Sequence, residues 1–204
     1  MSFQLNLAIN PADLQTLIDE GQQIVLVKST LLQTSLAWLC LPPSSNNCIQ
    51  WDENYYIYAQ MERVEIGTQI RMDYQSAVVP GLHNFRSFGS FFPGPNNNPQ
   101  PNSYSIANQY IQQPYITVGL AQPVRLNGSL AMVNPMLAYV VFPNNTITFR
   151  TVNQVTIFVS NTITTSQLIS NEISANALSI DFTTAPETNI VYDPVKGGFV
   201  LAGL

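Results

Sequence analysis

Charged residues are scarce in this chain of 204 amino acids. They make up 9% of the sequence, against roughly 25% in an ordinary soluble domain. The 7 Lys and Arg residues are outnumbered by 12 Asp and Glu residues, which gives a formal net charge of −5. The basic residues form no cluster, and nucleic-acid binding needs one to displace the counterions of the phosphates. The sequence therefore argues against a nucleic-acid partner.

Histidine and cysteine are also rare: the chain has His83, Cys40 and Cys48. A Ser-His-Asp or Cys-His site would have to use His83, which we expect in a loop, and a zinc site needs more ligands of these types. The carboxylates between residues 52 and 73 show no spacing that would pair them across a cleft. Phosphate-binding and nucleophile-elbow motifs are missing. We predict that the protein is not an enzyme and has no catalytic residue, metal site or cofactor.

Long apolar runs are missing as well. No stretch approaches the roughly 18 apolar residues that read as a membrane-spanning helix. The opening residues MSFQLNLAINPADL lack the basic and then apolar segments of a secretory signal. The expectation is a cytoplasmic protein without a signal peptide, released, if at all, by lysis or by a route other than Sec.

Asparagine, glutamine, serine and threonine supply most of the polarity. A surface of such residues is weakly hydrated and hardly repels a second copy of itself. It suits neutral polar partners, such as glycans, for the same reason. We therefore predict a homo-oligomer whose outside partners are glycans or a cell surface.

One short helix and many strands follow from the local patterns. Asn10 is a helix cap, Pro11 suits the first turn and Gly21 ends the helix. Runs of β-branched and aromatic residues then alternate with Pro, Gly or Asn, as strands do. The predicted strands are residues 24–28, 36–41, 55–59, 115–118, 137–142, 155–159, 178–182, 189–192 and 198–201. The fold class is all-β.

The chain also resembles itself. Leu36-Ala-Trp-Leu-Cys-Leu-Pro matches Leu137-Ala-Tyr-Val-Val-Phe-Pro, and the matches continue at residues 49–51 with 147–149, 57–60 with 157–160 and, more loosely, 67–70 with 165–168. We interpret residues 24–79 and 115–171 as two copies within one domain, 1–204. Residues 80–114 connect the copies, and the C-terminal strands lie in 178–204.

Each copy is predicted to form an antiparallel hairpin, with Leu39 opposite Ile49 and Val140 opposite Phe149. Residues directly opposite each other share a face. This register places the following apolar residues on one core face per copy: Ala37, Leu39, Leu41, Ile49 and Trp51, and then Ala138, Val140, Phe142, Ile147 and Phe149. Two such units would pack as an antiparallel β-sandwich with a helical cap. A β-barrel is the alternative.

The same register puts Cys40 directly opposite Cys48, on the face away from the core. Such a pair can form a disulfide only if it is a close, non-hydrogen-bonded one. Two free thiols are the expected state in a chain without a signal peptide. The disulfide stays open at this point.

Four aromatic residues fall on the outward face and are the candidate ligand-binding residues: Trp38, Tyr56, Tyr58 and Tyr139. They alternate with amides and hydroxyls, and sugars stack their C–H faces on rings while their hydroxyls bond to polar groups. A protein interface uses the same residues. A third possibility is that another layer of the same fold covers them.

The connection of residues 80–114 holds six of the 14 prolines and four of the 10 phenylalanines. We expect a long loop, irregular over PGPNNNPQP. Its phenylalanines are Phe85, Phe88, Phe91 and Phe92. They could plug an open end of the sandwich, contact a neighbouring subunit, or dip into a membrane interface without spanning it.

The leading hypothesis is a non-enzymatic, lectin-like binding protein that self-associates. One alternative is a structural protein that assembles into filaments or intracellular crystals. Another is an insecticidal or pore-forming toxin that inserts residues 87–92 or the Ser/Thr-rich run 160–174 into lipid.

Overall fold

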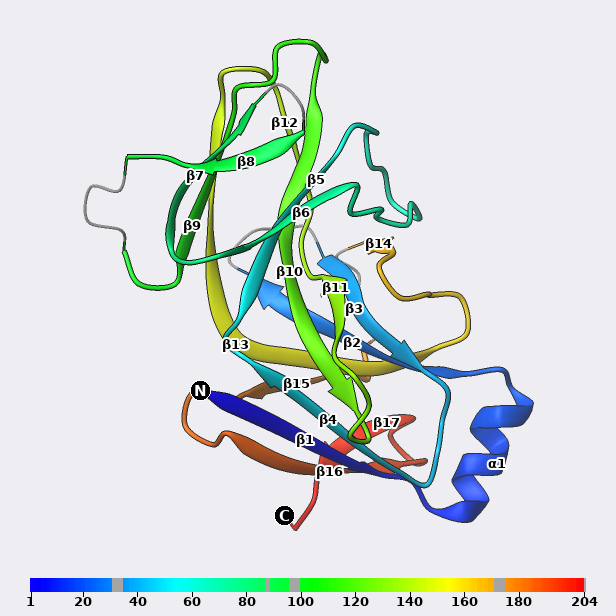
Figure 1. Ribbon diagram of the computed structural model, residues 1–204. Coiled ribbons are helices and arrows are strands. Elements are labelled where there is room, and N and C mark those ends of the chain that lie inside the picture. The colour runs from blue at the N-terminus through cyan, green and yellow to red at the C-terminus, as the bar shows by residue number, and fades with distance from the viewer. Residues whose placement is uncertain (31–34, 87–88, 96–99, 171–174, 204) are drawn as a thin grey trace.

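Two β-sheets pack against each other in the computed structural model, which describes residues 1–30, 35–86, 89–95, 100–170 and 175–203 (Figure 1). The nine-stranded sheet contains, in spatial order, β17 (Gly198–Leu201), β16 (Glu187–Asp193), β1 (Ser2–Ala8), β4 (Asn46–Asp52), β10 (Ile116–Leu126), β5 (Tyr55–Gln60) and β6 (Tyr74–Val78). Two further strands, β11 (Met132–Pro135) and β12 (Tyr139–Val141), also pair with β10.

The eight-stranded sheet runs β14 (Leu168–Ile169), β3 (Ser35–Leu41), β2 (Gln23–Thr30), β13 (Thr146–Ser160), β9 (Ser103–Asn108), β7 (Gly81–Arg86) and β8 (Ser90–Pro93), with β15 (Leu178–Asp181) paired to β13. Both paths end at edge strands and do not close, so the predicted β-sandwich is confirmed and the barrel alternative is wrong. The sheets are mixed, because β1 pairs with β16 and β7 pairs with β9 in parallel.

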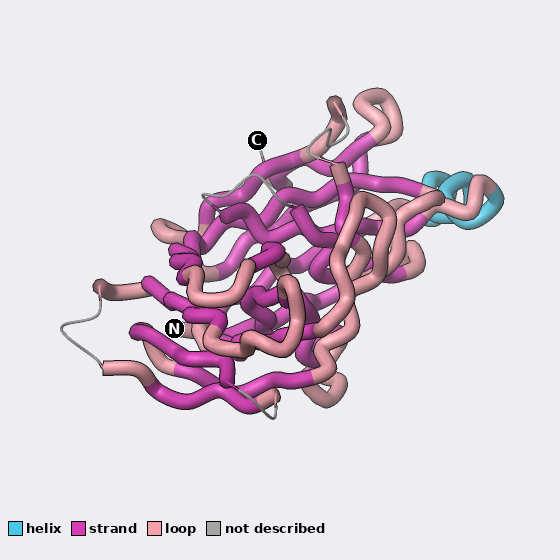
Figure 2. The backbone as a smooth tube through the Cα atoms, turned by 90° about the horizontal axis from the view of Figure 1, so that it is seen from above, coloured by secondary structure: helices cyan, strands magenta, loops and turns pink. Residues whose placement is uncertain are grey.

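The helix forms where the sequence predicts it. In α1 (Pro11–Asp19) the Asn10 side chain accepts a hydrogen bond from the backbone N–H of Ala12, 3.1 Å away, and so caps the first turn. Gly21 follows with a φ of 65°, which a glycine adopts at little cost. The helix lies at the edge of the strand layers (Figure 2), with Leu17 buried against them.

Each predicted strand overlaps an observed one, but the sequence interpretation missed others. The strand β1 was missed although Phe3, Leu5 and Leu7 alternate with polar residues. The connection 80–114 is not a long loop, because it contains β7, β8 and β9. Strands β7 and β9 form because the apolar side chains of Phe85, Tyr104 and Ile106 are buried in the core between the sheets, and Phe91 of β8 packs against that core. Residues 96–99 of PGPNNNPQP lie outside the described residues.

The predicted hairpins are wrong. Strands β3 and β4 belong to different sheets, as do β12 and β13. Leu39 pairs with Leu26, and Ile49 with Leu5. In the second copy, Val140 pairs with Thr117 and Phe149 with Tyr104.

Proline explains the failure in both copies. Pro42 and Pro43 follow β3, and Pro143 follows β12. Because proline cannot donate to a strand ladder, each strand ends before these residues, and the chain then enters the other sheet. Cys40 and Cys48 are therefore not opposite each other, and both are free thiols.

The predicted core faces are right in part. Leu39, Leu41, Ile49, Trp51 and Phe149 are buried in the main core, and Ile147 packs against it. The remaining predicted core residues are Ala37, Ala138, Val140 and Phe142: the first three pack in two smaller clusters outside the main core, and Phe142 is 58% exposed.

A β-bulge breaks the expected alternation at Trp38. Leu26 pairs with Leu39, but the next residue, Val27, pairs with Ala37, so Trp38 is an extra residue in β3. Both Trp38 and its neighbour Leu39 therefore reach the main core. The Trp38 ring meets the Trp51 ring edge-on, with 5.6 Å between the centroids.

Two segments that the predicted repeat aligns pair with each other. Gln69 and Gln167, aligned by the self-similarity, form an isolated antiparallel bridge. The backbone N–H of Gly67 donates to the carbonyl of Leu168 (2.7 Å), and the N–H of Leu168 donates to the carbonyl of Thr68 (2.9 Å). A twofold relation between two copies brings equivalent segments together in this way. The repeat and domain boundaries themselves stay predictions.

Candidate functional site

The outer face of the nine-stranded sheet carries a continuous line of polar side chains, which we call the polar strip. Its members are Gln4 and Asn6 of β1, Cys48, Gln50 and Asp52 of β4, and Arg125 and Asn127 at the end of β10. The strip follows from strand periodicity, because the residues between them, such as Leu5, Ile49 and Val124, point into the core. Gln50 pairs with Gln4 on one side and with Arg125 on the other.

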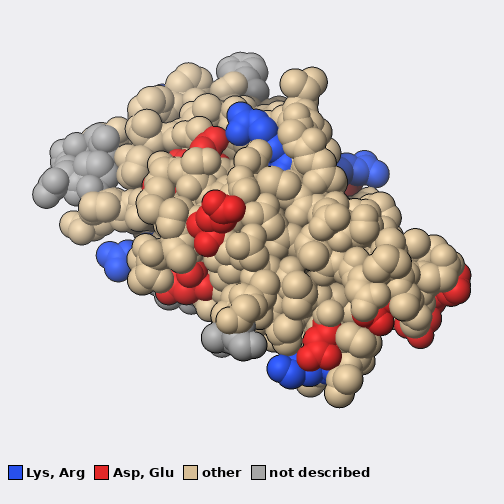
Figure 3. Space-filling view, turned by 90° about the horizontal axis from the view of Figure 1, so that it is seen from below, with Lys and Arg blue, Asp and Glu red and all other residues tan. Residues whose placement is uncertain are grey.

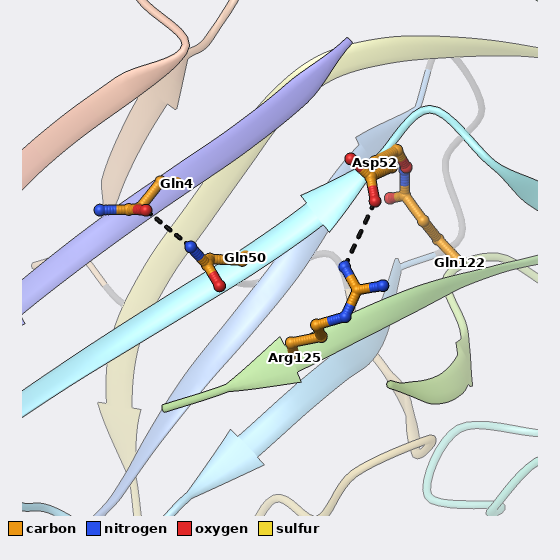
Figure 4. Close-up of polar contacts among 5 residues, drawn as sticks. All are labelled: Gln4, Gln50, Asp52, Gln122 and Arg125. Atoms are coloured by element: carbon orange, nitrogen blue, oxygen red, sulfur yellow. Dashed lines mark hydrogen bonds and ion pairs between the residues drawn. The ribbon is translucent and has the colours of Figure 1, made fainter. Parts of the chain in front are cut away.

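Hydrogen bonds between amides order one half of the strip. Gln50 donates from Nε2 to Oε1 of Gln4 over 2.8 Å (Figure 4). Gln4 donates to Oδ1 of Asn6 at 3.1 Å, and Asn6 donates to Glu187 (2.9 Å) and to Asn189 (2.8 Å) on β16. The side chains thus hold one another in fixed orientations.

At one end of the strip lies the aromatic pocket, with a volume of about 350 Å³. Its lining includes the charged or polar side chains of Asp52, Asn54 and Arg125 and the aromatic ring of Tyr56, together with Pro123. Arg125 Nη1 lies 3.4 Å from Asp52 Oδ2 (Figure 4). This pair is partly exposed, so it contributes about 1 kcal/mol or less and can open to a ligand.

Buried residues support Asp52 and Tyr56, which line two sides of the aromatic pocket. Gln122 lies on the inner side of β10 and donates from Nε2 to the backbone carbonyl of Asp52 over 2.8 Å. Tyr56 is half-buried and packs on a small cluster around Tyr58, Ala121 and Leu168, which we call the satellite cluster. The Tyr56 ring therefore combines an exposed part with a packed support.

At the other end of the strip lies the amide pocket, with a volume of about 470 Å³. Asn6, Asn46, Cys48, Asn127 and Asn189 line it together with the small apolar residues Ala8, Val191 and Ala202. Its polar groups are neutral amides and a thiol. Burial and, to a lesser extent, the Glu187 carboxylate raise the pKa of the Cys48 thiol.

Asn127 locks the wall of the amide pocket. Its backbone has a φ of 52°, and its Oδ1 accepts a hydrogen bond from the backbone N–H of Cys48 at 2.7 Å. Its Nδ2 donates to Oδ1 of Asn47 at 3.2 Å. Asn47 is 5% exposed, and among the described residues its own buried Nδ2 finds no partner.

Of the four predicted ligand-binding aromatics, Tyr56 alone lines one of these pockets. Trp38 and Tyr58 are both fully buried, so neither is open to a ligand, and the prediction that Trp38 faces outward is wrong. The bulge turns Trp38 into the core, where its Nε1 donates to the carbonyl of Gln122 at 3.2 Å. Tyr58 does lie on the outer face of β5, but the satellite cluster covers it, and its hydroxyl donates to the carbonyl of Leu137 at 2.6 Å.

The second-copy aromatic, Tyr139, also departs from the prediction. It is half-buried and packs against the main core, with its ring centroid 5.9 Å from that of Phe149. The strands β12 and β13 lie in facing sheets and not in one hairpin. Tyr139 therefore points toward the core, although the hairpin register predicted that it lies on the outer face.

The phenylalanines of residues 80–114 divide by burial. Phe85 is fully buried and contacts the rings of Tyr74, Phe91 and Tyr110, which supports the plug interpretation for this residue. Phe91 is half-buried. Phe92 is 42% exposed and lies 5.3 Å from the Arg86 guanidinium. Phe88 lies outside the described residues.

Metal-ligating side chains do not gather in the described part of the chain. Over the described ranges, no group of three or more His, Cys, Asp or Glu side chains could hold a metal ion. His83 lies on β7 and not in a loop, and its Nε2 is 3.0 Å from the carbonyl oxygen of Val79. In the described part of the chain no helix has both the length and the apolar character needed to cross a membrane.

Sequence reasoning did not single out Asp52, Arg125, Asn127 and Asn189 as site residues. The alternation of apolar and amide residues in SFQLNLA was the available signal for the strip. No local sequence pattern predicts that β1, β4 and β10 are neighbours in one sheet. Comparisons with protein-family models, with curated proteins and with solved structures each found no match.

Proposed function

We propose that this protein is a non-enzymatic, lectin-like binding protein whose aromatic pocket accepts one sugar ring of a neutral glycan. One observation carries the proposal: the Tyr56 ring lies in the same pocket as a carboxylate, an amide and a guanidinium. A sugar ring stacks its C–H face on an aromatic ring, and its hydroxyls need donors and acceptors at the sides. Asp52 accepts, Arg125 donates and Asn54 does both.

The size and charge of the aromatic pocket agree with such a ligand. Its volume of about 350 Å³ lies within the range of small-molecule sites, roughly 300–1,000 Å³. Arg125 already has Asp52 as its partner. An anionic sugar would therefore have to compete with the Asp52 carboxylate, whereas neutral hydroxyls can bridge the two charged groups.

A glycan array followed by titration calorimetry on the best neutral glycan tests the proposal. We expect Tyr56→Ala to lower the affinity about tenfold, the equivalent of one aromatic contact. Tyr56→Phe should keep most of the affinity, because stacking needs only the ring. Tyr115→Ala is the matched control, since Tyr115 is also half-buried but does not line the pocket.

Two results would contradict the proposal. One is that no neutral glycan is retained by the wild-type protein. The other is that Tyr56→Ala, shown by near-ultraviolet circular dichroism to be folded, binds as tightly as Tyr115→Ala.

Self-association is the second part of the proposed function. Charged groups are scattered over the otherwise uncharged face that Figure 3 shows. Leu130, on the β10–β11 connection, is 92% exposed, and Met132, the first residue of β11, is 44% exposed. Low charge gives little repulsion between copies. Sedimentation over a concentration series should show association that changes little with salt and weakens in Leu130→Lys. A monomer at the highest concentration would contradict it.

A further inference from the structure

The two pockets are ends of one surface. On β4, Cys48 lines the amide pocket, Asp52 lines the aromatic pocket, and Gln50 lies between them on the same face. Four residues of extended strand separate the ends, which is about 13 Å. Arg125 and Asn127 repeat this arrangement on the neighbouring chain segment, one in each pocket. A ligand that reaches both pockets must therefore be longer than one sugar ring.

The polar strip and the amide pocket at its end offer free hydrogen-bonding groups. A primary amide has two N–H donors and an oxygen acceptor. Gln50 uses one donor toward Gln4, and no partner for its Oε1 occurs among the described residues. Asn189 accepts from Asn6, and the structure shows no partner for its own amide N–H groups over the described ranges. These groups match hydroxyls that both donate and accept.

The position of the strip also discriminates between kinds of polymer. A peptide that adds to a sheet needs an unpaired strand edge. Here β1 and β4 have partners on both sides, so the strip presents side chains and no free backbone. A polyanion would meet the carboxylates of Asp52 and Glu187, and the Arg125 guanidinium is already paired. A neutral chain rich in hydroxyls meets neither obstacle.

We propose, building on the function proposed above, that the ligand is an extended neutral oligosaccharide. One sugar ring occupies the aromatic pocket at Tyr56. The chain then crosses Gln50, and its other end lies in the amide pocket between Asn6, Asn127 and Asn189. The protein recognises glycan length as well as the identity of one sugar.

A length series of the best neutral glycan, from the monosaccharide upward, tests this inference by calorimetry. We expect the affinity to rise at least tenfold with length and to level off once the strip is covered. Gln50→Ala and Asn189→Ala should reduce the ratio between the affinity for the longest ligand and that for the monosaccharide. Asn161→Ala, an exposed asparagine outside the strip, is the control and should leave this ratio unchanged.

Cys48 provides a second readout that does not depend on mutation. Its thiol lies in the amide pocket, so a long glycan should slow its alkylation severalfold, while the monosaccharide should not. Cys40 lies outside both pockets and is the internal reference in the same digest, provided that alkylation is run above about pH 9, where the Cys40 thiol also reacts. Mass spectrometry measures the two rates separately.

The outcomes separate this inference from the proposed function. If the monosaccharide binds through Tyr56 but length adds no affinity and leaves Cys48 unprotected, the inference is overturned and the proposed function stands. If no neutral glycan of any length binds, both are overturned. If Cys48 becomes protected without glycan as the protein concentration rises, a second copy of the chain occupies the strip, and the inference is wrong.

Discussion

The ammonium nitrogen of Lys28 lies 4.1 Å from the centroid of the Trp51 ring and 4.6 Å from that of Trp38. The side chain is 3% exposed, and in the described part of the chain it forms no ion pair. Burial lowers the pKa of Lys28 well below its usual value, and the Glu53 carboxylate acts in the opposite direction. The two indoles favour the charged amine by a cation–π contact, which offsets only part of the cost of desolvation.

We expect Lys28→Met to stabilise the fold by about 1 kcal/mol or more, because a flexible apolar side chain replaces a desolvated amine. The pH dependence follows from the lowered pKa. Between the folded pKa of Lys28 and about 10.5, unfolding takes up a proton, so wild-type stability rises with pH by up to about 1.4 kcal/mol per unit. Below the folded pKa the lysine is protonated in both states, and this slope vanishes.

Urea unfolding of both proteins over a pH series measures this effect. The free energy of unfolding of Lys28→Met should lack the part of the slope that Lys28 contributes in the wild-type protein. An identical slope in the two proteins would show that Lys28 keeps its ordinary pKa in the fold.

Gly119 allows the backbone at Leu137 to approach closely beside Tyr58. A Cβ at this position would lie 2.0 Å from the carbonyl oxygen of Leu137 and 2.7 Å from the Tyr58 ring and hydroxyl. We expect Gly119→Ala to destabilise the fold by about 3 kcal/mol, because overpacking adds to the loss of the bond from Tyr58 to Leu137. Thermal unfolding measures this cost. Tyr58→Phe removes the hydrogen bond alone and should cost about 1 kcal/mol, so equal losses in the two variants would argue against steric crowding.

The two thiols should differ in reactivity. Burial raises the pKa of Cys40 to about 11, and the Thr165 hydroxyl only partly compensates. Since the thiolate is the reactive form, alkylation of Cys40 should stay slow up to about pH 9 and then accelerate. Cys48 is less buried and should react first. The expected product at pH 8 without ligand is a singly modified chain labelled at Cys48, and equal labelling of both cysteines would contradict this.

Asn108 should stabilise the end of the sandwich where β9 meets the β12–β13 connection. It is fully buried, its Nδ2 donates to the carbonyl of Val141 at 2.9 Å, and its Oδ1 accepts from the N–H of Tyr110 at 3.0 Å. Asn108→Ala leaves both backbone groups without their partner and should cost about 2–3 kcal/mol. Asn161→Ala, at an exposed position, should lie within about 0.5 kcal/mol of the wild-type protein.

Local patterns were sufficient for the fold class and for the elements that depend on neighbours in sequence. The Asn10 cap, the Pro11 start and the placement of Tyr56 and Tyr58 on the outer face of β5 all appear in the structure as predicted. The partner of each strand could not be predicted in the same way. It depends on the turn at Pro42 and Pro43, which in principle fits either a hairpin or a corner between sheets.

The candidate site was less predictable than the fold for two physical reasons. The bulge at Trp38 adds one residue to β3, and no local residue type requires it. Tyr58 has the parity of an outward residue, but its exposure is decided by the satellite cluster, whose members come from distant segments. Tyr56, two residues earlier in the chain, escapes complete cover and was correctly placed on the outer face.

The long strand β13 has a consequence for how the molecule comes apart. Residues 146–150 pair with β9, while residues 154–160 pair with β2 and β15 after a shift of register. The two ends of the eight-stranded sheet thus share one uninterrupted backbone, with no linker at which either end could detach. We expect melting to be a single cooperative transition, in which loss of either end removes the template for the other.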